Sequence, residues 1–238
     1  MEAFPTIFAV ANANNEQILR LWNGLGYNSR ALRLKKTCEE IAVIHQGIIP
    51  NTYDQLRSLP GIGDYTASAI LCFAFRVPIV VVDVNVVRVI SRYFSQQMFT
   101  TDSLDAKHIR EVLTTLIPKN NSSEFFQAIM DIARLYCKKS SPNCSECPLS
   151  AKCLSSNQLT FKKVIKRVEP SYLGFPRRIW RGKVLKIVTA TSPISLEELL
   201  QKLEMSEHSE WILSVIRLLQ KDQLIAYTSK DGLISIQS

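Results

Sequence analysis

The stretch LPGIGDYTASAI, residues 59–70, decides the fold, because it joins a glycine-containing turn to the start of a helix. Gly61 and Gly63 permit backbone conformations that other residues avoid, and we expect the helix to begin near Asp64 or Tyr65. Such a turn leaves backbone N–H groups unpaired at a helix N-terminus, where they bind phosphate oxygens. Taken alone, it also fits a tight helix–helix connection, so its meaning depends on the rest of the chain.

The surrounding chain, residues 1–137, is mostly helical in pattern. Residues 31–47 predict a helix that stops at Gly47, and residues 65–75 predict a short apolar helix directed towards Pro78. Cys72 on the second helix is expected to be an ordinary core residue. The first helix places four residues on one expected core face: Leu34, Cys38, Ile41 and Ala42.

Two further helices are predicted ahead of the main cysteine cluster. The segment DSLDAKHIREVLTTLIP predicts a helix capped by Asp102 or Ser103. The segment SSEFFQAIMDIARLYC predicts a helix capped by Ser122 or Ser123. Its apolar positions recur at helical spacing: Phe125, Ile129 and Ile132.

The run VVVDVNVVRV, residues 80–89, places Asp83 among valines. β-Branched apolar residues predict buried structure, and burying an unpaired carboxylate is costly or neutralises it. Because aspartate is a favoured N-cap, we expect Asp83 to cap the helix VNVVRVISRYF, with Asn85 bracing the carboxylate. A cap would hold the group rigid and ionised through backbone N–H bonds, and it would leave one oxygen for chemistry.

The net charge of +8 is concentrated in one segment. Between residues 157 and 190 nine bases oppose one acid, Glu169, and the rest of the chain then holds 29 − 9 = 20 bases and 21 − 1 = 20 acids. A local basic field attracts polyanions, nucleic acid before anionic membrane, although a solvated linker fits the same composition. The nine bases are Lys162, Lys163, Lys166, Arg167, Arg177, Arg178, Arg181, Lys183 and Lys186.

Nothing in the sequence indicates a membrane protein. No apolar stretch reaches the roughly 18 residues that a membrane span needs. The N-terminal segment MEAFPTIFAV carries an acid where a signal peptide carries bases. We therefore predict a monomeric cytoplasmic protein, associated with the nucleoid if the source is prokaryotic.

Four of the six cysteines form the pattern Cys137-x6-Cys144-x2-Cys147-x5-Cys153. Short loops of this kind bring four thiolates to one centre, as tetrahedral zinc or an iron–sulfur cluster requires. A disulfide pair is disfavoured in a chain with no secretory signal. The spacing by itself leaves zinc and iron–sulfur open.

The last third of the chain predicts a separate unit. Residues 157–176 are polar, basic and proline-containing, which indicates a linker. Helices follow over about 178–190, after Ser195, and over 209–222, and the strands LIAYTS and LISIQ flank the turn KDG. This is the winged-helix pattern, which binds DNA in some proteins and only protein in others. We expect four regions: 1–120, helical core; 121–156, helix and cysteine loop; 157–176, linker; and 177–238, winged-helix-like domain.

Three motifs in this order, LPGIGDYTA, VDVNVVRV and the four-cysteine loop, resemble the helix-hairpin-helix (HhH-GPD) iron–sulfur DNA glycosylases over residues 4–154. The resemblance implies a mainly α fold, with a glycosylase core and cluster loop ahead of the small α+β C-terminal domain. It implies that Asp83 is the catalytic aspartate and that the partner is double-stranded DNA with a mismatched or damaged base. A 4Fe-4S cluster would be held by Cys137, Cys144, Cys147 and Cys153. The implied DNA contacts are Leu59, Pro60, Gly61, Ile62, Gly63, Tyr65, Tyr27, Asn85 and Arg88.

Within this family, LWNGLGYNSRALRL and the segment leading into the cysteine loop look most like the adenine glycosylase branch. There the tyrosine after the GLG turn, here Tyr27, wedges into DNA. Family members that also cut the strand carry a lysine where this chain has Tyr65, and a tyrosine cannot attack the sugar as an amine. The resemblance therefore implies monofunctional release of adenine opposite G or 8-oxoguanine.

Two features depart from that branch. Adenine glycosylases carry a glutamate on an N-terminal helix, in a segment like E-x-M-L-Q-Q-T, which protonates the adenine. This chain begins at MEAFPTIF, downstream of that segment, and nothing around Glu2 matches it. We expect severely impaired adenine excision if this is the full chain. The winged-helix pattern also replaces the Nudix-like domain that reads 8-oxoguanine in many adenine glycosylases.

Two other functions fit the same residues. VDVNVVRVISRYF also looks like the thymine mismatch branch. A thymine or uracil glycosylase, or an endonuclease III-like protein, depends less on acid catalysis because a pyrimidine leaves as a stabilised anion. A non-catalytic DNA-binding iron–sulfur protein would keep the hairpin, cluster and winged helix, and replacing Asp83 with Asn would cost it nothing.

Overall fold

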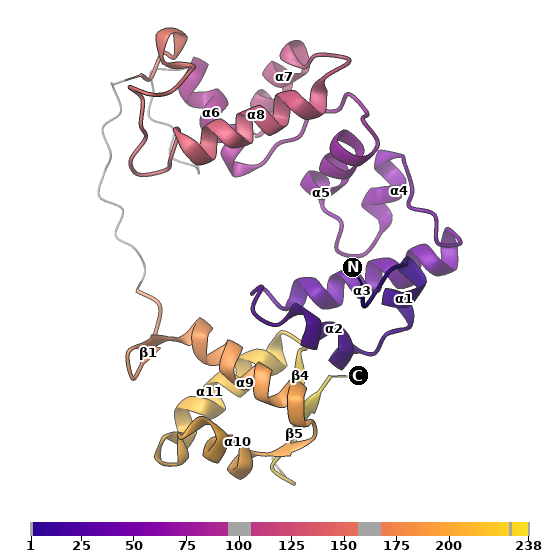
Figure 1. Ribbon diagram of the computed structural model, residues 1–238, viewed down its shortest axis with the longest axis vertical. Helices are drawn as coiled ribbons and strands as arrows, with labels where there is room; N and C mark the ends of the chain where they lie inside the picture. Colours follow the sequence, from indigo (N-terminus) through magenta and orange to yellow (C-terminus); the bar gives the residue numbers. More distant parts are fainter. Residues whose placement is uncertain (1, 95–105, 157–167, 229, 238) are drawn as a thin grey trace. The chain divides into compact units, whose positions relative to one another are not determined.

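A computed structural model describes residues 2–94, 106–156, 168–228 and 230–237 (Figure 1). The chain forms two compact units. Unit 1 contains residues 1–49, 59–61 and 166–238, and unit 2 contains residues 50–58 and 62–165. The division into four regions expected from the sequence stays a prediction. Some residues singled out in the sequence lie outside the described ranges: Asp102, Ser103, Lys162, Lys163, Lys166 and Arg167.

The fold is mainly helical, as expected. No helix in the described ranges is long and apolar enough to cross a membrane. The α-helices are α1 (Ile7–Asn12), α2 (Asn15–Trp22), α3 (Ser29–Ile44), α4 (Tyr53–Ser58), α5 (Asp64–Ala69), α6 (Val84–Phe94), α7 (Ala106–Leu116), α8 (Ser122–Leu135), α9 (Arg177–Thr191), α10 (Leu196–Leu203) and α11 (Ser209–Lys221). Shorter elements are the π-helical η1 (Ile70–Ala74) and the 3-10 turns η2 (Ser150–Lys152) and η3 (Ser206–His208). The strands are β1 (Ser171–Tyr172), β2 (Phe175–Pro176), β3 (Ile194–Ser195), β4 (Ile225–Thr228) and β5 (Leu233–Ile236).

The glycine stretch folds as a helix–turn–helix connection between α4 and α5. Gly61 has φ 83°, a left-handed conformation that favours glycine, and Gly63 is the N-cap of α5. The helix begins at Asp64, as predicted, and continues through η1. It runs towards Pro78, as predicted, and ends at Ala74, two residues ahead of Arg76 with its positive φ of 58°.

Two predictions about individual side chains are wrong. Leu34 was expected in the core, but 46% of it is exposed; the buried face of α3 is formed by Ala31, Thr37, Cys38 and Ile41. Ser122 and Ser123 were expected to cap α8, whereas the N-cap is Asn121. Both serines are instead buried within the first turn of that helix, and Ser122 Oγ lies 3.4 Å from the carbonyl oxygen of Val77.

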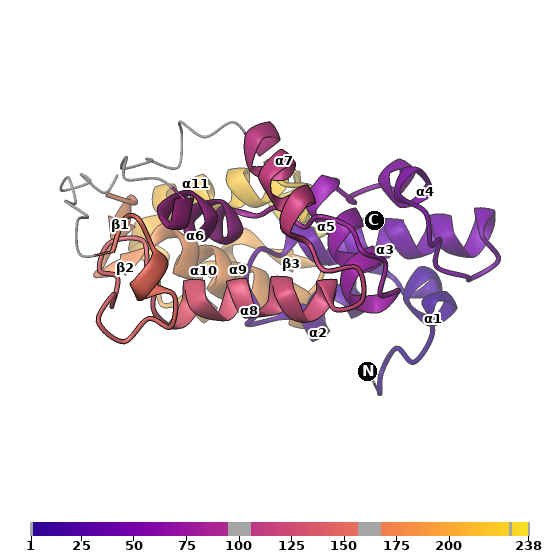
Figure 2. The same ribbon diagram turned by 90° about the horizontal axis from the view of Figure 1, so that it is seen from above.

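The core of unit 2 forms where α6 packs on α7 and α8 (Figures 1 and 2). Its fully buried side chains include Cys72, Val86, Leu113 and Phe126. The valine run before Asp83 forms no strand, but Val81 is completely buried in this core. The prediction of a buried valine run therefore holds only in part, because Val84 is 66% exposed. The burial of Val80 and Val81 fixes the chain just ahead of α6.

In unit 1 the C-terminal residues form a winged-helix arrangement. Helices α9, α10 and α11 precede the β4–β5 hairpin, and β3 completes a three-stranded antiparallel sheet in the order β3-β5-β4 (Figure 1). The segment expected to be a linker also contains the short β1–β2 hairpin, which turns at Gly174 with φ 76°. The winged-helix prediction is confirmed.

The N-terminal helices share one hydrophobic core with these winged-helix elements. Leu19 of α2 and Ala31 of α3 belong to the same buried cluster as Val184 of α9 and Leu219 of α11. Polar bonds support the contact: Arg20 Nη2 donates to the carbonyl oxygen of Thr189 at 3.1 Å. Unit 1 is therefore stabilised by apolar burial between segments far apart in the sequence.

Replacing Leu19, which is 1% exposed, by alanine should destabilise unit 1 by about 2–5 kcal/mol, because it removes apolar contacts and leaves a cavity. All three tryptophans of the chain lie in unit 1, so the fluorescence-detected thermal transition reports its unfolding. Leu21→Ala on the same helix, where the side chain is 55% exposed, should have a much smaller effect. Equal shifts for both variants would contradict the shared core.

Candidate active site and cysteine loop

Asp83 caps α6, as its position in the sequence predicts. Its Oδ1 accepts hydrogen bonds from the backbone N–H groups of Asn85, at 2.9 Å, and Val86, at 2.7 Å. Its Oδ2 accepts a hydrogen bond from the side-chain amide of Asn85 at 2.8 Å. Asp83 is half-buried, and Oδ2 accepts one of these bonds whereas Oδ1 accepts two, so the group is held in one orientation.

Tyr65 lies near this carboxylate within unit 2. Partial burial raises the pKa of its phenol, and the negative charge of Asp83 raises that pKa further. The phenol is therefore neutral, and 44% of the residue is exposed. Tyr65 and Asp83 come from different elements, α5 and the start of α6, and they are brought within electrostatic reach.

Charged and polar side chains hold the two helices of the hairpin together. Tyr53 Oη donates to Asp64 Oδ1 at 3.0 Å, and Arg57 Nε lies 2.5 Å from the same oxygen. Both interactions lower the pKa of Asp64, the hydrogen bond from Tyr53 most strongly. Arg57 also donates to the carbonyl oxygen of Ile62 at 2.6 Å. This clamp sets the geometry of the turn, and the sequence analysis missed it.

The turn itself carries the predicted backbone-binding residues. Gly61 and Gly63 are exposed, and no described side chain caps the N-terminus of α5. Its first N–H groups are thus open to an external acceptor. Leu59, also expected to contact DNA, is buried and anchors the turn in the protein interior. Thr37 of α3 donates to the carbonyl oxygen of Pro60 at 2.6 Å.

Tyr27, in unit 1, projects from the loop between α2 and α3. It has a positive φ of 47° and is 82% exposed, which is unusual for an aromatic residue. The loop is held by a hydrogen bond from Trp22 Nε1 to the carbonyl oxygen of Gly26 at 3.0 Å. A fixed loop thus presents an uncovered aromatic ring.

The four predicted ligand cysteines, Cys137, Cys144, Cys147 and Cys153, line one small cavity in unit 2. Burial raises the pKa of the Cys153 thiol; a hydrogen bond from the backbone of Ser155 opposes this shift, and the other three cysteines add to it. The thiols are therefore near one another. No group of three or more His, Cys, Asp or Glu side chains in the described ranges is placed to hold a metal ion. Cys38 and Cys72, expected in the core, are buried.

Two arginines of α6 attach this loop to the helix that begins at Asp83. Arg88 Nε donates to the carbonyl oxygen of Cys137 at 2.7 Å, and its Nη2 donates to that of Ala133 at 3.2 Å. Arg92 Nη1 lies 3.4 Å from Cys137 Sγ and 2.9 Å from the carbonyl oxygen of Lys138. These bonds direct the guanidinium of Arg88 towards the loop, and the expected contact of Arg88 with DNA stays a prediction.

The loop also closes on α6 through backbone groups. The N–H of Leu154 donates to the carbonyl oxygen of Tyr93, and that of Ser155 donates to the carbonyl oxygen of Arg92, both at 3.1 Å. The spacing of Arg88 and Arg92, four residues apart on one helix face, is the only sequence signal for this attachment. One helix thus positions the carboxylate at one end and the cysteine loop at the other.

The chain belongs to the HhH-GPD superfamily of base excision DNA repair proteins. The model of that family matches residues 1–117. An adenine DNA glycosylase from Mycolicibacterium smegmatis is 34% identical over 201 residues, which is 84% of this chain and 67% of that relative.

Other curated relatives bear the same name. An adenine DNA glycosylase from Buchnera aphidicola subsp. Baizongia pistaciae is 37% identical over 155 residues, covering 65% of this chain and 44% of that relative. The chain therefore spans less than half the length of this relative.

Solved structures agree with the fold. A thermostable thymine-DNA glycosylase has a TM-score of 0.60 at 27% identity, covering 66% of this chain and 73% of that one. A trapped endonuclease III–DNA covalent intermediate has a TM-score of 0.55 at 28% identity, covering 65% and 71%.

Replacing Arg92 with lysine should loosen the cysteine loop, because lysine keeps the charge but lacks the planar set of donors. Hydrogen–deuterium exchange of peptides covering residues 137–156 should become faster. The matched control is Arg134→Lys on α8, where the arginine is exposed and lies near Asp131. Unchanged exchange in the Arg92 variant would contradict the bracing role.

Proposed function

We propose that this protein is a base excision glycosylase that hydrolyses the N-glycosidic bond of an adenine mispaired with G or 8-oxoguanine. The observation that carries the proposal is the carboxylate of Asp83, fixed by three N–H donors at the start of α6. The names of the curated relatives support adenine as the target.

The chemistry follows from the charge that develops on the sugar. Breaking the bond between base and deoxyribose leaves positive charge at the sugar carbon, as in other glycoside hydrolyses. A carboxylate that is already oriented stabilises this charge without reorganisation and helps to orient the attacking water. Oδ1 of Asp83 is occupied by two backbone donors, whereas Oδ2 accepts one bond from Asn85. Oδ2 is thus the oxygen with capacity for the substrate.

The remaining site residues would hold the DNA. The target base must leave the stack, which costs least at a mismatch. The exposed glycines and free N–H groups of the hairpin suit a phosphate of the backbone. The uncovered ring of Tyr27 suits insertion between bases, because a rigid aromatic side chain can replace lost stacking.

We also propose that the enzyme leaves the DNA strand uncut. Strand cleavage in glycosylases of this kind needs an amine that attacks the sugar and forms a Schiff base. The residue beside Asp83 is Tyr65, whose phenol has a raised pKa and carries no amine. Hydrolysis by water is the reaction that these side chains support.

The cofactor we propose is a 4Fe-4S cluster on Cys137, Cys144, Cys147 and Cys153. Four thiols that line one cavity fit this group, because each cysteine ligates one iron of the cluster. The N–H groups of Arg92 near Cys137 Sγ suit a thiolate. When bound, the cluster would cross-link the loop. Arg88 and Arg92, which contact Cys137, would then hold α6 against an ordered loop.

A thymine or uracil target is the second candidate. The structural likeness to a thymine-DNA glycosylase favours it, and a pyrimidine needs less help to leave. Duplexes carrying A or T opposite G, tested side by side, separate the two candidates.

Asp83→Asn should lower the single-turnover rate of adenine release from an A·G duplex by about 10²-fold or more, because the neutral amide cannot stabilise the sugar cation. Release is measured as alkali-labile sites in the labelled adenine strand. Binding of the same duplex should remain, since the amide keeps the shape of the cap.

The control for this variant is Asp131→Asn, which removes a carboxylate of unit 2 that lies near Arg134 on α8. It should release adenine at the rate of the unmodified chain. If no base is released in an Asp83-dependent manner from any mismatch, the enzymatic proposal fails, and the chain is a DNA-binding protein.

Cys147→Ser should remove the cluster, so that the purified chain loses iron, acid-labile sulfide and visible absorption. Cys72→Ala is the control: Cys72 is buried in the core of unit 2 and does not line the cysteine cavity, so iron should be retained. Bound zinc without sulfide in the unmodified chain would contradict the cluster and favour a zinc site.

A further inference from the structure

Unit 1 contains a groove of about 800 Å³ between α3 and the end of α11. The helix α3 supplies one wall, including Arg33 and Lys36, and Lys221 in the last turn of α11 lies on the other. The wall on the α11 side thus comes from the winged-helix elements, and the groove exists only because these pack against the N-terminal helices.

The groove carries excess positive charge. Lys35 pairs with Glu39, and Asp222 pairs with Arg181 at 2.5 Å, so these charges are balanced locally. No described residue forms an ion pair or hydrogen bond with the side chains of Arg33, Lys36 or Lys221, and all three residues are exposed. Three uncompensated cations that share one groove suit a polyanion.

The groove also adjoins the glycine turn of the hairpin. A Cβ atom built on Gly61 would lie 3.0 Å from Cβ of Arg33, so the two residues are in close contact. Thr37, one turn further along α3, donates to the carbonyl oxygen of Pro60. The groove therefore lies beside Pro60 and Gly61 of the turn, which belong to the same unit.

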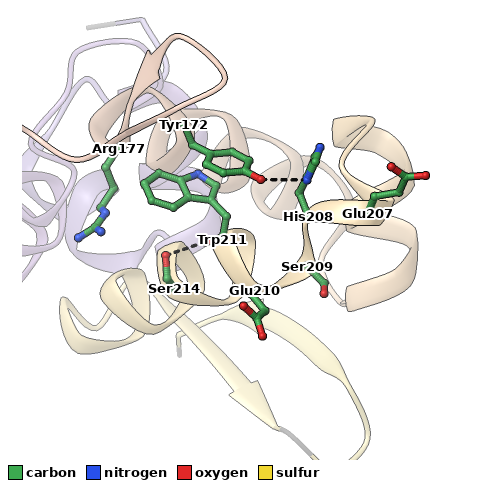
Figure 3. A pocket seen from close by; sticks show the side chains of 8 residues that line it. All are labelled: Tyr172, Arg177, Glu207, His208, Ser209, Glu210, Trp211 and Ser214. Atoms are coloured by element: carbon green, nitrogen blue, oxygen red, sulfur yellow. Dashed lines mark hydrogen bonds between the residues drawn. The ribbon is translucent and has the colours of Figure 1, made fainter.

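At the opposite end of the winged helix, two carboxylates and one guanidinium, that of Arg177, line one cavity. In a DNA-reading helix-turn-helix, the N-terminal residues of the recognition helix approach the base edges. Here the N-terminus of α11 bears Glu210 and follows Glu207, beside a cavity of about 480 Å³ (Figure 3). In α10, Lys202 lies 3.5 Å from Glu198, which balances its charge. These carboxylates would repel the phosphates that flank a groove of DNA.

We propose that the groove between α3 and α11 binds the sugar–phosphate backbone of duplex DNA, and that the winged helix acts as a backbone clamp that does not read bases. The proposal rests on the proposed function for the choice of DNA as the polyanion. It assigns the winged helix a role that its sequence left open, through Lys221 at the far end of the expected recognition helix.

The test measures the affinity of the full-length chain for labelled duplex DNA over a range of salt concentrations, in the Asp83→Asn background so that the DNA stays intact. The double variant Lys36→Ala/Lys221→Ala should bind several-fold more weakly. The slope of log affinity against log salt should fall by about 1 for each lysine removed, because fewer counterions are released. The loss should be the same for mismatched and fully paired duplexes, since backbone contacts carry no sequence information.

Three controls make the outcome decisive. Lys202→Ala removes a lysine of the same unit outside the groove and should leave the slope unchanged. The double variant Lys36→Arg/Lys221→Arg should keep the slope of the unmodified groove, because both positive charges are kept. The thermal transition of each variant shows that unit 1 is folded.

A slope that is unchanged in the double alanine variant overturns the proposal. So does a loss confined to one DNA sequence, which would indicate base reading. Adenine release is measured separately on the unmodified chain. If the chain releases no base and the slope still falls, the groove proposal stands and the enzymatic function fails.

Discussion

Three N–H donors converge on the carboxylate of Asp83, and most of the site depends on this interaction. The two backbone donors belong to the first turn of α6, so the same bonds begin the helix and fix the carboxylate. A charged acceptor at a helix N-terminus is favoured by the unpaired N–H groups and by the helix dipole. The completely buried Val81 and Val86 on either side hold this arrangement in the core of unit 2. The buried valines therefore help to fix the orientation of the charge, and Val86 also donates its backbone N–H to it.

The same helix joins the cysteine loop to the proposed catalytic carboxylate. Arg88 and Arg92 lie one and two turns after the cap, and both donate to the loop around Cys137. An ordered loop supplies carbonyl oxygens that accept hydrogen bonds from the two guanidinium groups. These bonds hold α6 against α8. Loss of order at the cysteines would free α6 at one end, while its other end carries the carboxylate proposed to react. If the proposed cluster is bound, it would act on the carboxylate through this helix, without contact between metal and substrate.

Sequence reasoning succeeded where the interactions are local. The cap at Asp83 is predictable because its donors lie two and three residues away, and the winged helix is predictable because its helices and hairpin follow regular spacing. It failed for Leu34, whose position on the helix face says nothing about which neighbour covers that face. It also missed the role of Arg88, because its acceptors lie 45 and 49 residues further along the chain. Contacts between distant segments have no periodic signature.

The winged helix is connected to the hairpin through the core of unit 1. Ala31 of α3 is completely buried in the same cluster as the residues of α9 and α11. The next turns of α3 carry Arg33 and Thr37, which contact Gly61 and Pro60 of the hairpin turn. Because protein cores are close-packed, displacing α3 would require repacking of the winged-helix elements beneath it. The C-terminal elements therefore stabilise the helix that supports the glycine turn, and their removal would weaken that turn even if they touched no DNA.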